Sequence, residues 1–279
     1  MTMSWVEAFG RADEVDGTLR WGIVADGPTG PVPALLHAPS AAAPMPVVLL
    51  GHGGGGAKDD AGWQAVARFL AVEVPAAVLC IDGPFQGERS PRDGPDRDRR
   101  IRRALADPAT ATNLAGDWRA ALDRLAGVRD LRDGDLGYFG YSMGTMLGVP
   151  VCADLPVRAA VFAAGGVFGD DVMRFVDEPD PALAEIEAQQ FRTRSALVLE
   201  AAARLADVDV LQLCMSRDDV FPMTGALELF AAFPGPKRLV AWDGRHIEMP
   251  HEALDLAAWF LRRTLNGHGS NLSRTIGAF

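Results

Sequence analysis

Residues 137–146 form an apolar run that turns at a serine between two glycines, and this run constrains the fold more than any other feature. The residues read GYFGYSMGTM, with Ser142 at the centre. The residues before Ser142 favour a strand and those after it favour a helix. A sharp turn between the two would lift the serine hydroxyl out of the sheet, and side chains in place of Gly140 and Gly144 would crowd that turn. The pattern predicts the strand, serine turn and helix known as a nucleophile elbow.

Unbroken apolar runs alternate with helix-like segments along the rest of the chain. The predicted strands cover residues 18–24, 32–37, 47–50, 76–82, 135–141, 158–164, 208–215 and 237–242. The predicted helices between and after them cover about 60–73, 112–127, 143–153, 222–233 and 250–265. The first two strands suit an antiparallel pair, and the later apolar runs suit strands covered on both faces. We expect an α/β architecture, with a mostly parallel central sheet flanked by helices, in one domain over residues 1–279.

Three segments depart from this alternation. Residues 170–205 turn helical and amphipathic, which predicts a small helical lid insertion within the domain. Residues 266–279 carry no pattern and are expected to form a loose C-terminal tail. Residues 83–103 are turn-rich, with seven arginines against four acids. Such a run is usually a solvated surface; the functional alternative is that Arg89 or Arg92 attracts an anionic substrate at the mouth of a pocket.

Composition disfavours several classes of partner and location. The formal net charge is −10 and the isoelectric point is near 5.0, which disfavours binding to nucleic acid or to an anionic membrane. The three cysteines lie in apolar segments without close spacing, which suggests buried reduced thiols. Neither a signal-like N-terminal region nor an apolar span of 18 residues is found. We therefore expect a cytoplasmic protein with no membrane or nucleic-acid partner.

The run Gly51-His52-Gly53-Gly54-Gly55-Gly56 directly follows a predicted strand. Without side chains in the way, the main-chain N–H groups of such a run can approach a ligand, as an oxyanion hole requires. The alternatives are a flexible loop or a phosphate cradle. The phosphate alternative lacks the Gly-Lys-Ser/Thr ending, because Lys58 follows Ala57 and precedes Asp59.

Residues with catalytic chemistry follow three of the predicted strands. Ser142, Asp218 and His246 each come after a strand end, in the order nucleophile, acid, histidine. The carboxyl ends of parallel strands share one edge of a sheet, so these residues are expected to meet there. The neighbouring Asp219 is the rival for the acid.

Together these features resemble the serine hydrolases of the α/β-hydrolase superfamily, and most of all the dienelactone-hydrolase-like esterases. The resemblance covers about residues 18–265. The matching stretches are PVVLLGHGG at 46–54, DGPFQGER at 82–89, the elbow, the DDVFP segment from Asp218 to Pro222, and GRH at 244–246. Dienelactone hydrolases proper carry a cysteine nucleophile, whereas this chain has Ser142, which points to ordinary esters or thioesters. Haloalkane dehalogenases and epoxide hydrolases of this fold have aspartate there, so both reactions are disfavoured.

The resemblance implies a mechanism and a class of substrate. Ser142 would attack an acyl carbon, His246 would remove its proton, and Asp218 would orient the imidazole. Asp218 is favoured over Asp219 because it stands four residues before Pro222, where the resemblance places the acid. The N–H groups of Gly54 and Met143 would bind the oxyanion. The substrate would be a small-molecule ester or related acyl compound. No metal is expected, because the histidines lack H-x-x-x-H spacing and the sequence has no His/Cys cluster. No cofactor is implied, and the sequence does not indicate an oligomeric state.

Other functions remain open at this stage. The same three residues could cleave a thioester, an amide or peptide, or a carbon–carbon bond beside a ketone. A non-catalytic ligand-binding homologue is less favoured, because three dispersed catalytic residues would readily be lost once activity was no longer needed.

Overall fold

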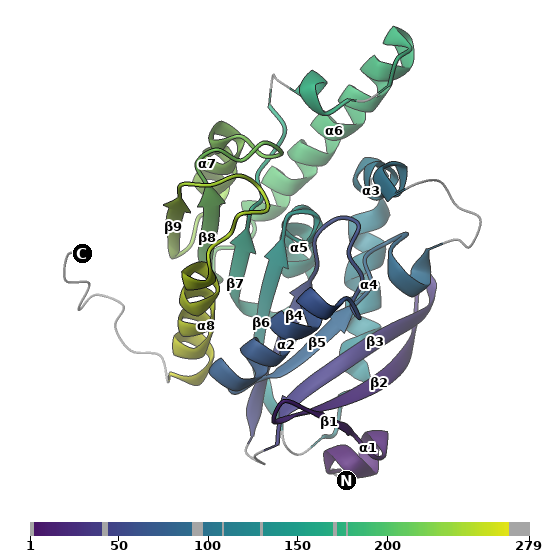
Figure 1. The fold of residues 1–279 in the computed structure, drawn as a ribbon, viewed down its shortest axis with the longest axis vertical. Coiled ribbons are helices and arrows are strands. Elements are labelled where there is room, and N and C mark those ends of the chain that lie inside the picture. The colour runs from purple at the N-terminus through teal and green to yellow at the C-terminus, as the bar shows by residue number, and fades with distance from the viewer. Residues whose placement is uncertain are drawn as a thin grey trace, which may run out of the picture.

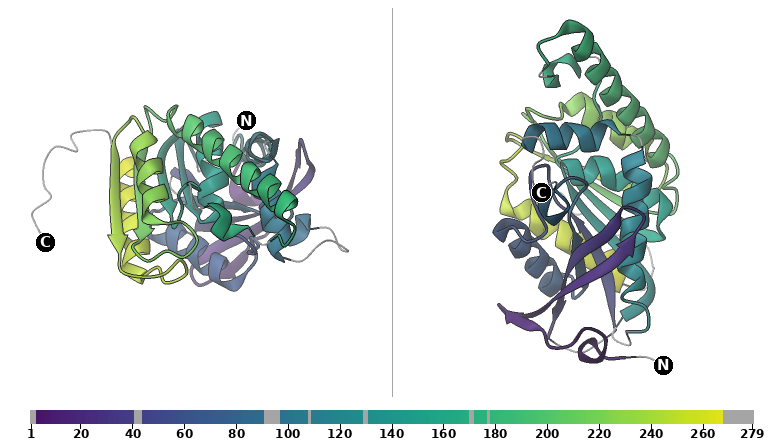
Figure 2. Two further views of the ribbon diagram at one scale, coloured as in Figure 1. Left: turned by 90° about the horizontal axis from the view of Figure 1, so that it is seen from above. Right: turned by 90° about the vertical axis from the view of Figure 1, so that its right-hand side faces the viewer.

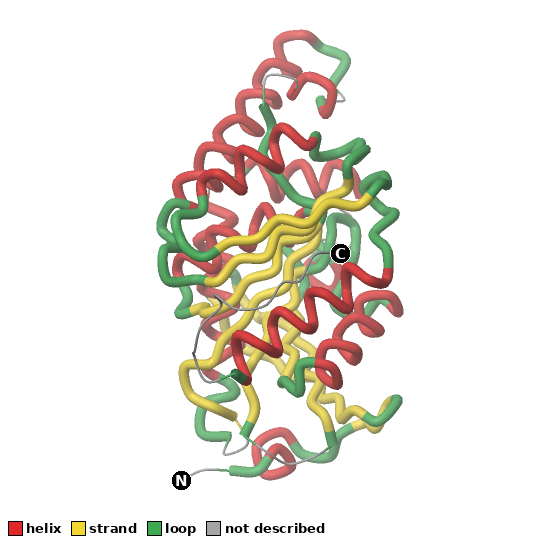
Figure 3. The backbone as a smooth tube through the Cα atoms, turned by 90° about the vertical axis from the view of Figure 1, so that its left-hand side faces the viewer, coloured by secondary structure: helices red, strands yellow, loops and turns green. Residues whose placement is uncertain are grey.

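The computed structural model describes residues 3–40, 44–90, 97–107, 109–128, 131–169, 172–176 and 178–267. These residues form a central sheet with helices on both sides (Figures 1 and 3). The strands are β1 (Asp13–Val15), β2 (Thr18–Gly27), β3 (Gly30–Pro39), β4 (Met45–Gly51), β5 (Ala77–Ile81), β6 (Leu131–Tyr141), β7 (Val157–Ala163), β8 (Asp209–Met215) and β9 (Lys237–Trp242).

The helices connect these strands. They are α1 (Trp5–Phe9), α2 (Ala61–Glu73), α3 (Arg97–Ala106), α4 (Ala109–Asp123), α5 (Met143–Asp154), α6 (Pro181–Ala202), α7 (Met223–Ala232) and α8 (His251–Asn266), with short 3-10 helices η1 (Gly87–Arg89) and η2 (Val172–Phe175). Between β7 and β8, η2 and α6 form an insertion, and the N-terminal part of α6 extends beyond the body of the molecule (Figure 2).

The strand order is β1-β2-β3-β5-β4-β6-β7-β8-β9 among the described residues. β1, β2 and β3 pair antiparallel with their neighbours, β3 pairs antiparallel with β5, and every pair from β5 to β9 is parallel. The antiparallel leading pair and the mostly parallel sheet are therefore confirmed. Because β4, β6, β8 and β9 run in one direction, the loops after them meet at one edge of the sheet.

Alternating side chains of the central strands enter two separate cores. Along β4, Leu49 packs with α4 and α5 on one face, and Val48 and Leu50 pack with α2 and α8 on the other. Leu49 and Leu50 are 0% and 1% exposed, and burying one such side chain contributes about 1.5–3 kcal/mol. Burial on both faces explains why β4 is apolar at every position from 47 to 50.

The structure differs from the sequence-based expectation mainly in the Arg-rich segment. The predicted loop over 83–103 contains η1 and the start of α3. Ile101, Ala104 and Leu105 recur at helical spacing and pack into the core, while Arg102 pairs with Glu187 of α6 at 3.2 Å. Because charged residues dominate this segment, its short apolar stripe did not lead to the prediction of a helix.

Smaller differences concern the ends of elements. β1 and α1 lie outside the predicted elements, and α4 begins at Ala109 instead of about 112, because the Asp107 carboxylate accepts the Ala109 N–H at 2.9 Å. Most of the expected tail, residues 268–279, lies outside the described residues, and Asn266 is the last residue of α8. All three cysteines are buried and unpaired. None of the helices in the described ranges combines the length and apolar character that spanning a bilayer requires.

Candidate active site

Ser142 occupies the predicted turn between β6 and α5. Its backbone has φ 55° and ψ −113°, a conformation that residues other than glycine rarely adopt. The two flanking glycines are required sterically: a Cβ at Gly140 would lie 2.5 Å from the carbonyl oxygen of Gly144, and one at Gly144 would lie 2.2 Å from that of Gly51. The Thr145 hydroxyl holds the turn by donating to the Gly140 carbonyl at 3.0 Å. The predicted elbow geometry is therefore present.

The structure brings the three predicted side chains together in a chain of hydrogen bonds. Nε2 of His246 lies 2.8 Å from Oγ of Ser142. On the other side of the ring, Nδ1 lies 3.0 Å and 2.9 Å from the two carboxylate oxygens of Asp218. A carboxylate can only accept, so the ring proton belongs on Nδ1, and Nε2 is left to accept the Ser142 hydroxyl. This is the arrangement that a proton acceptor for serine requires.

Asp218 and Asp219 have different contacts, although both follow β8. The side chain of Asp218 is 3% exposed, and its Oδ1 accepts the N–H groups of Val220 and Phe221, each at 2.8 Å. Those bonds fix the carboxylate against the His246 ring. Asp219 is exposed, and its Oδ1 accepts the backbone N–H of His246 at 3.3 Å. Only Asp218 contacts the imidazole, which favours it over Asp219 as the acid.

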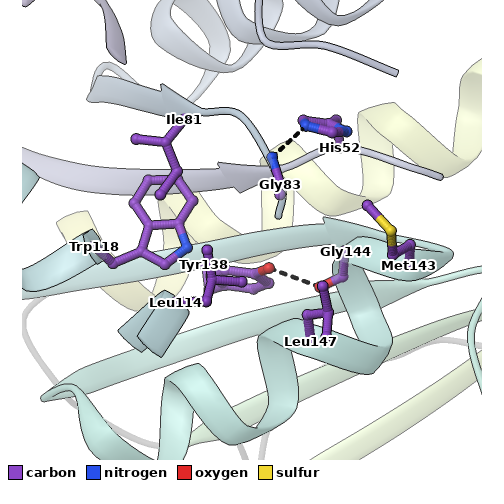
Figure 4. A pocket seen from close by; sticks show the side chains of 10 residues that line it. His52, Ile81, Gly83, Leu114, Trp118, Tyr138, Met143, Gly144 and Leu147 are labelled. Atoms are coloured by element: carbon purple, nitrogen blue, oxygen red, sulfur yellow. Dashed lines mark hydrogen bonds between the residues drawn. The ribbon is translucent and has the colours of Figure 1, made fainter. Parts of the chain in front are cut away.

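His52 holds the start of the glycine run in place. Its Nε2 accepts the Gly83 N–H at 2.8 Å, so Nδ1 carries the proton that is shared with the Gly53 carbonyl at 2.8 Å (Figure 4). Burial lowers the pKa of His52, which keeps the ring neutral and in this tautomer. His52 is thus a brace between the ends of β4 and β5.

A buried ion pair holds the other end of the run. Nζ of Lys58 lies 3.2 Å from the Asp82 carboxylate and also pairs with Glu88, and the Asp82 carboxylate accepts the Lys58 N–H at 2.7 Å. Lys58 is 3% exposed and Asp82 is 0% exposed. Burial lowers the pKa of Lys58, but the Glu88 and Asp82 carboxylates outweigh it and raise that pKa above its ordinary value. This ion pair could not be predicted from the sequence, because Lys58 and Asp82 are 24 residues apart and no local pattern links them.

The two predicted oxyanion donors lie on two segments that approach the serine turn. Met143 is the first residue of α5, so its N–H has no acceptor within the helix. Gly53, next to Gly54, lies close to the elbow: a Cβ there would be 3.8 Å from Cβ of Ser142. The side chain of Ile101 from α3 covers Gly54, with atoms 3.0–3.2 Å from where a Cβ would be. Both predicted donors thus lie on segments at the elbow.

The interpretation of Arg89 as an attractor for anionic substrates is not supported. Its guanidinium donates to the Asp82 carbonyl at 2.9 Å and to the Thr29 hydroxyl at 2.7 Å, and it pairs with the fully buried Asp117. Arg89 therefore ties its loop to α4. Arg92 lies outside the described residues.

Aromatic rings connect the inserted α6 to His246. Phe191 of α6 lies 4.8 Å from Phe168, which lies 5.1 Å from Phe221, and Phe221 lies 5.9 Å from the His246 ring, all between centroids. All three phenylalanines are buried. This apolar wall keeps water from one side of the imidazole.

A small cavity of about 20 Å³ lies beneath the elbow (Figure 4). Its lining is mainly apolar and includes Trp118, Met143 and Leu147, and Ser142 is not among the lining residues. Beside it, the Tyr138 hydroxyl donates to the Gly144 carbonyl at 2.7 Å. Among the described residues, no group of three or more His, Cys, Asp or Glu side chains is arranged to hold a metal ion.

Comparison with curated proteins gives a partial match. No family model matches the chain. The uncharacterized proteins Rv2307c and MT2364 of Mycobacterium tuberculosis are each 30% identical to it over 138 residues, which is 47% of this chain and 44% of theirs. The match therefore spans less than half the length of those relatives.

Solved structures match over most of the chain. A cold-adapted esterase from an Arctic intertidal metagenomic library has a TM-score of 0.72 and 25% identity, covering 94% of this chain and all of the other. The acetyl xylan esterase of Paenibacillus sp. R4 has a TM-score of 0.71 and 18% identity over 91% of this chain and 86% of its own, a likeness of fold alone. The chain has the α/β-hydrolase fold and is similar to esterases that share it.

Proposed function

We propose that this chain is a serine hydrolase that cleaves a carboxylic ester of a small molecule through an acyl-enzyme. One observation carries the proposal: Asp218, His246 and Ser142 form a continuous hydrogen-bonded series with steps of 2.9 and 2.8 Å. The three residues come from loops separated by up to 104 positions in the chain. The similarity to an esterase over nearly the whole chain supports the same reaction class.

The geometry supports a two-step reaction. Ser142 Oγ attacks the acyl carbon as its proton passes to Nε2 of His246, and Asp218 stabilises the imidazolium that forms. The imidazolium then gives that proton to the leaving alcohol oxygen, and the acyl group remains on Ser142. In the second step His246 takes a proton from water as the water oxygen attacks the acyl carbon. The bond between Oγ and the acyl carbon then breaks, His246 returns the proton to Ser142 Oγ, and the carboxylic acid leaves.

The negative charge of each tetrahedral intermediate requires donors that are already in place. The N–H groups of Met143 and Gly54 are assigned this role. A single such donor contributes about 3 kcal/mol to the transition state in related chemistry. The fixed glycine run supports the assignment, because His52 and Lys58 hold it at both ends.

Thioesters, amides and activated carbon–carbon bonds remain alternatives for the same three residues. Esters are preferred because the neighbour at 25% identity is named an esterase. A non-catalytic homologue is disfavoured, because Ser142, His246 and Asp218 are all present and are hydrogen-bonded in the order that catalysis requires.

The test is a comparison of four proteins on p-nitrophenyl esters of short and medium acyl chains. Ser142→Ala is expected to lower kcat by about 10³-fold or more, and Asp218→Asn by about 10³-fold, because each removes one part of the proton pathway. Asp219→Asn is the matched control, and it should stay within about threefold of wild type, since Asp219 does not contact the ring and the amide keeps an oxygen that can accept the His246 N–H. A Ser142→Ala protein with full activity would refute the proposal.

A further inference from the structure

His246 lies on a segment with little secondary structure. Residues 243–250 connect β9 to α8 and contain neither helix nor strand. Asp243, Arg245 and Ile247 are exposed, and Ile247 is 85% exposed. Hydrogen bonds from the Arg217 N–H to the Gly244 carbonyl and from the Glu248 N–H to the Arg245 carbonyl fix the backbone on either side of His246. His246 itself is held through the contacts that its own backbone and ring make.

Tyr141, the last residue of β6, holds the carbonyl end of His246. Its hydroxyl donates to the His246 carbonyl oxygen. The ring lies between the glycine run and α2: its centroid is 5.6 Å from that of Trp63, and a Cβ at Gly53 would lie 3.2 Å from its Cδ1. Burial, with the nearby charge of Asp218, raises the pKa of Tyr141 to about 12. The hydroxyl thus remains a donor throughout the pH range of an assay.

Asp219 holds the other end of the same residue. Its Oδ1 accepts the His246 N–H at 3.3 Å, across 27 positions in the chain. The neighbouring Asp218 holds the ring of His246 at the same time. Two adjacent residues of the loop after β8 therefore contact His246: Asp218 its side chain, and Asp219 its backbone.

We propose that Tyr141 and Asp219 are positioning residues that together clamp the backbone of His246, an inference that rests on the proposed function. Tyr141 directly precedes Ser142, and Asp219 directly follows Asp218. The clamp thus couples the histidine backbone to the segments that carry its two partners. A shift of the histidine by about 1 Å would cost about 10²-fold in rate, because proton transfer requires hydrogen-bond distance.

The experiment uses single substitutions in the full chain. Tyr141→Phe removes only the hydroxyl, and Asp219→Ala removes the acceptor for the His246 N–H. Asp219→Asn removes the charge but keeps an oxygen that can accept. Asp243→Ala is the matched control, because Asp243 lies in the same segment and pairs with the exposed Arg217 instead of with His246.

Two readouts are compared: kcat and KM on p-nitrophenyl acetate, and amide hydrogen exchange over residues 243–250. Tyr141→Phe and Asp219→Ala are each expected to lower kcat by about tenfold or more, with KM within about twofold of wild type and faster exchange in this segment. Asp219→Asn and Asp243→Ala should keep the kcat of wild type. If the two residues had only a structural role, the substitutions would instead change the melting temperature, and kcat would not fall while KM stayed constant.

Three results would overturn the clamp: wild-type kcat in both Tyr141→Phe and Asp219→Ala, an Asp219→Asn protein as slow as Asp219→Ala, or unchanged exchange over 243–250. If the wild type neither turns over esters nor forms an adduct at serine, the proposed function fails. The exchange measurement remains decisive in that case, because faster exchange confined to 243–250 in Tyr141→Phe supports the clamp without any activity.

Discussion

His37 should make this protein sensitive to mild acid. The side chain is 0% exposed on β3, and neither ring nitrogen has a hydrogen-bond partner among the described residues. The pKa of His37 is lowered from 6.5 to about 4, mainly by burial and also by the charges of Arg20 and Arg68. Gln64 raises the pKa of His37, although its side chain does not reach hydrogen-bond geometry, and it offsets only part of the effect of burial.

The sign of the effect follows from which state takes up the proton. The unfolded chain protonates His37 as the pH falls through about 6.5, whereas the folded chain does so only near pH 4. The stability contribution is therefore fully present above about pH 7.5, is lost progressively below it, and reaches its limit below about pH 4. A shift of about 2.5 pH units corresponds to about 3 kcal/mol in total, and to about 2 kcal/mol at pH 5.

The assay is urea unfolding at pH 7.5, 6 and 5 for the wild type, His37→Gln and His251→Gln. We expect the wild type to lose about 2 kcal/mol more than His37→Gln between pH 7.5 and 5, because glutamine does not titrate. His251 is the matched control, since its side chain is 73% exposed. Equal pH slopes for the wild type and His37→Gln would refute the reasoning, as would an equal effect of His251→Gln.

Three further substitutions test the packing around the serine. Gly144→Ala should destabilise the protein by about 3 kcal/mol in urea unfolding, because its Cβ would lie 2.2 Å from the Gly51 carbonyl oxygen; Gly62→Ala, with open space around it, should cause no loss. Asp82→Asn should destabilise by about 3 kcal/mol, since it leaves Lys58 buried with one partner fewer; an unchanged midpoint would contradict the role of this pair. Ile101→Ala should raise kcat/KM for octanoate relative to acetate esters by about fivefold, because Ile101 covers Gly54; an unchanged ratio would place the acyl chain elsewhere.

Local pattern was enough to predict the sheet and that the three proposed catalytic side chains lie together. Strands buried on both faces, such as β4 and β7, leave apolar runs in the sequence, and Ser142, Asp218 and His246 each follow a strand end within four residues. The elbow was predictable because its glycine–serine–glycine pattern is local and Gly140 lies against Gly144 within five residues, although the contact of Gly144 with Gly51 joins two strands.

Contacts between distant segments could not be predicted in the same way. The Tyr141 hydroxyl meets the His246 carbonyl across 105 positions, and the sequence marks neither residue as the partner of the other. Lys58 was considered only as a phosphate ligand, although its role is set by Asp82 at the end of a different strand. The α3 helix was missed because its arginines outnumber the three apolar residues that pack inward.

The central claim is that Ser142 is an activated nucleophile, and the most direct test is intact-protein mass spectrometry after treatment with a fluorophosphonate. We expect one adduct on the wild type and none on Ser142→Ala, because only a serine with a proton acceptor 2.8 Å away reacts readily. Absence of an adduct on folded wild type, or an adduct that persists in Ser142→Ala, would contradict the assignment of Ser142 as the nucleophile.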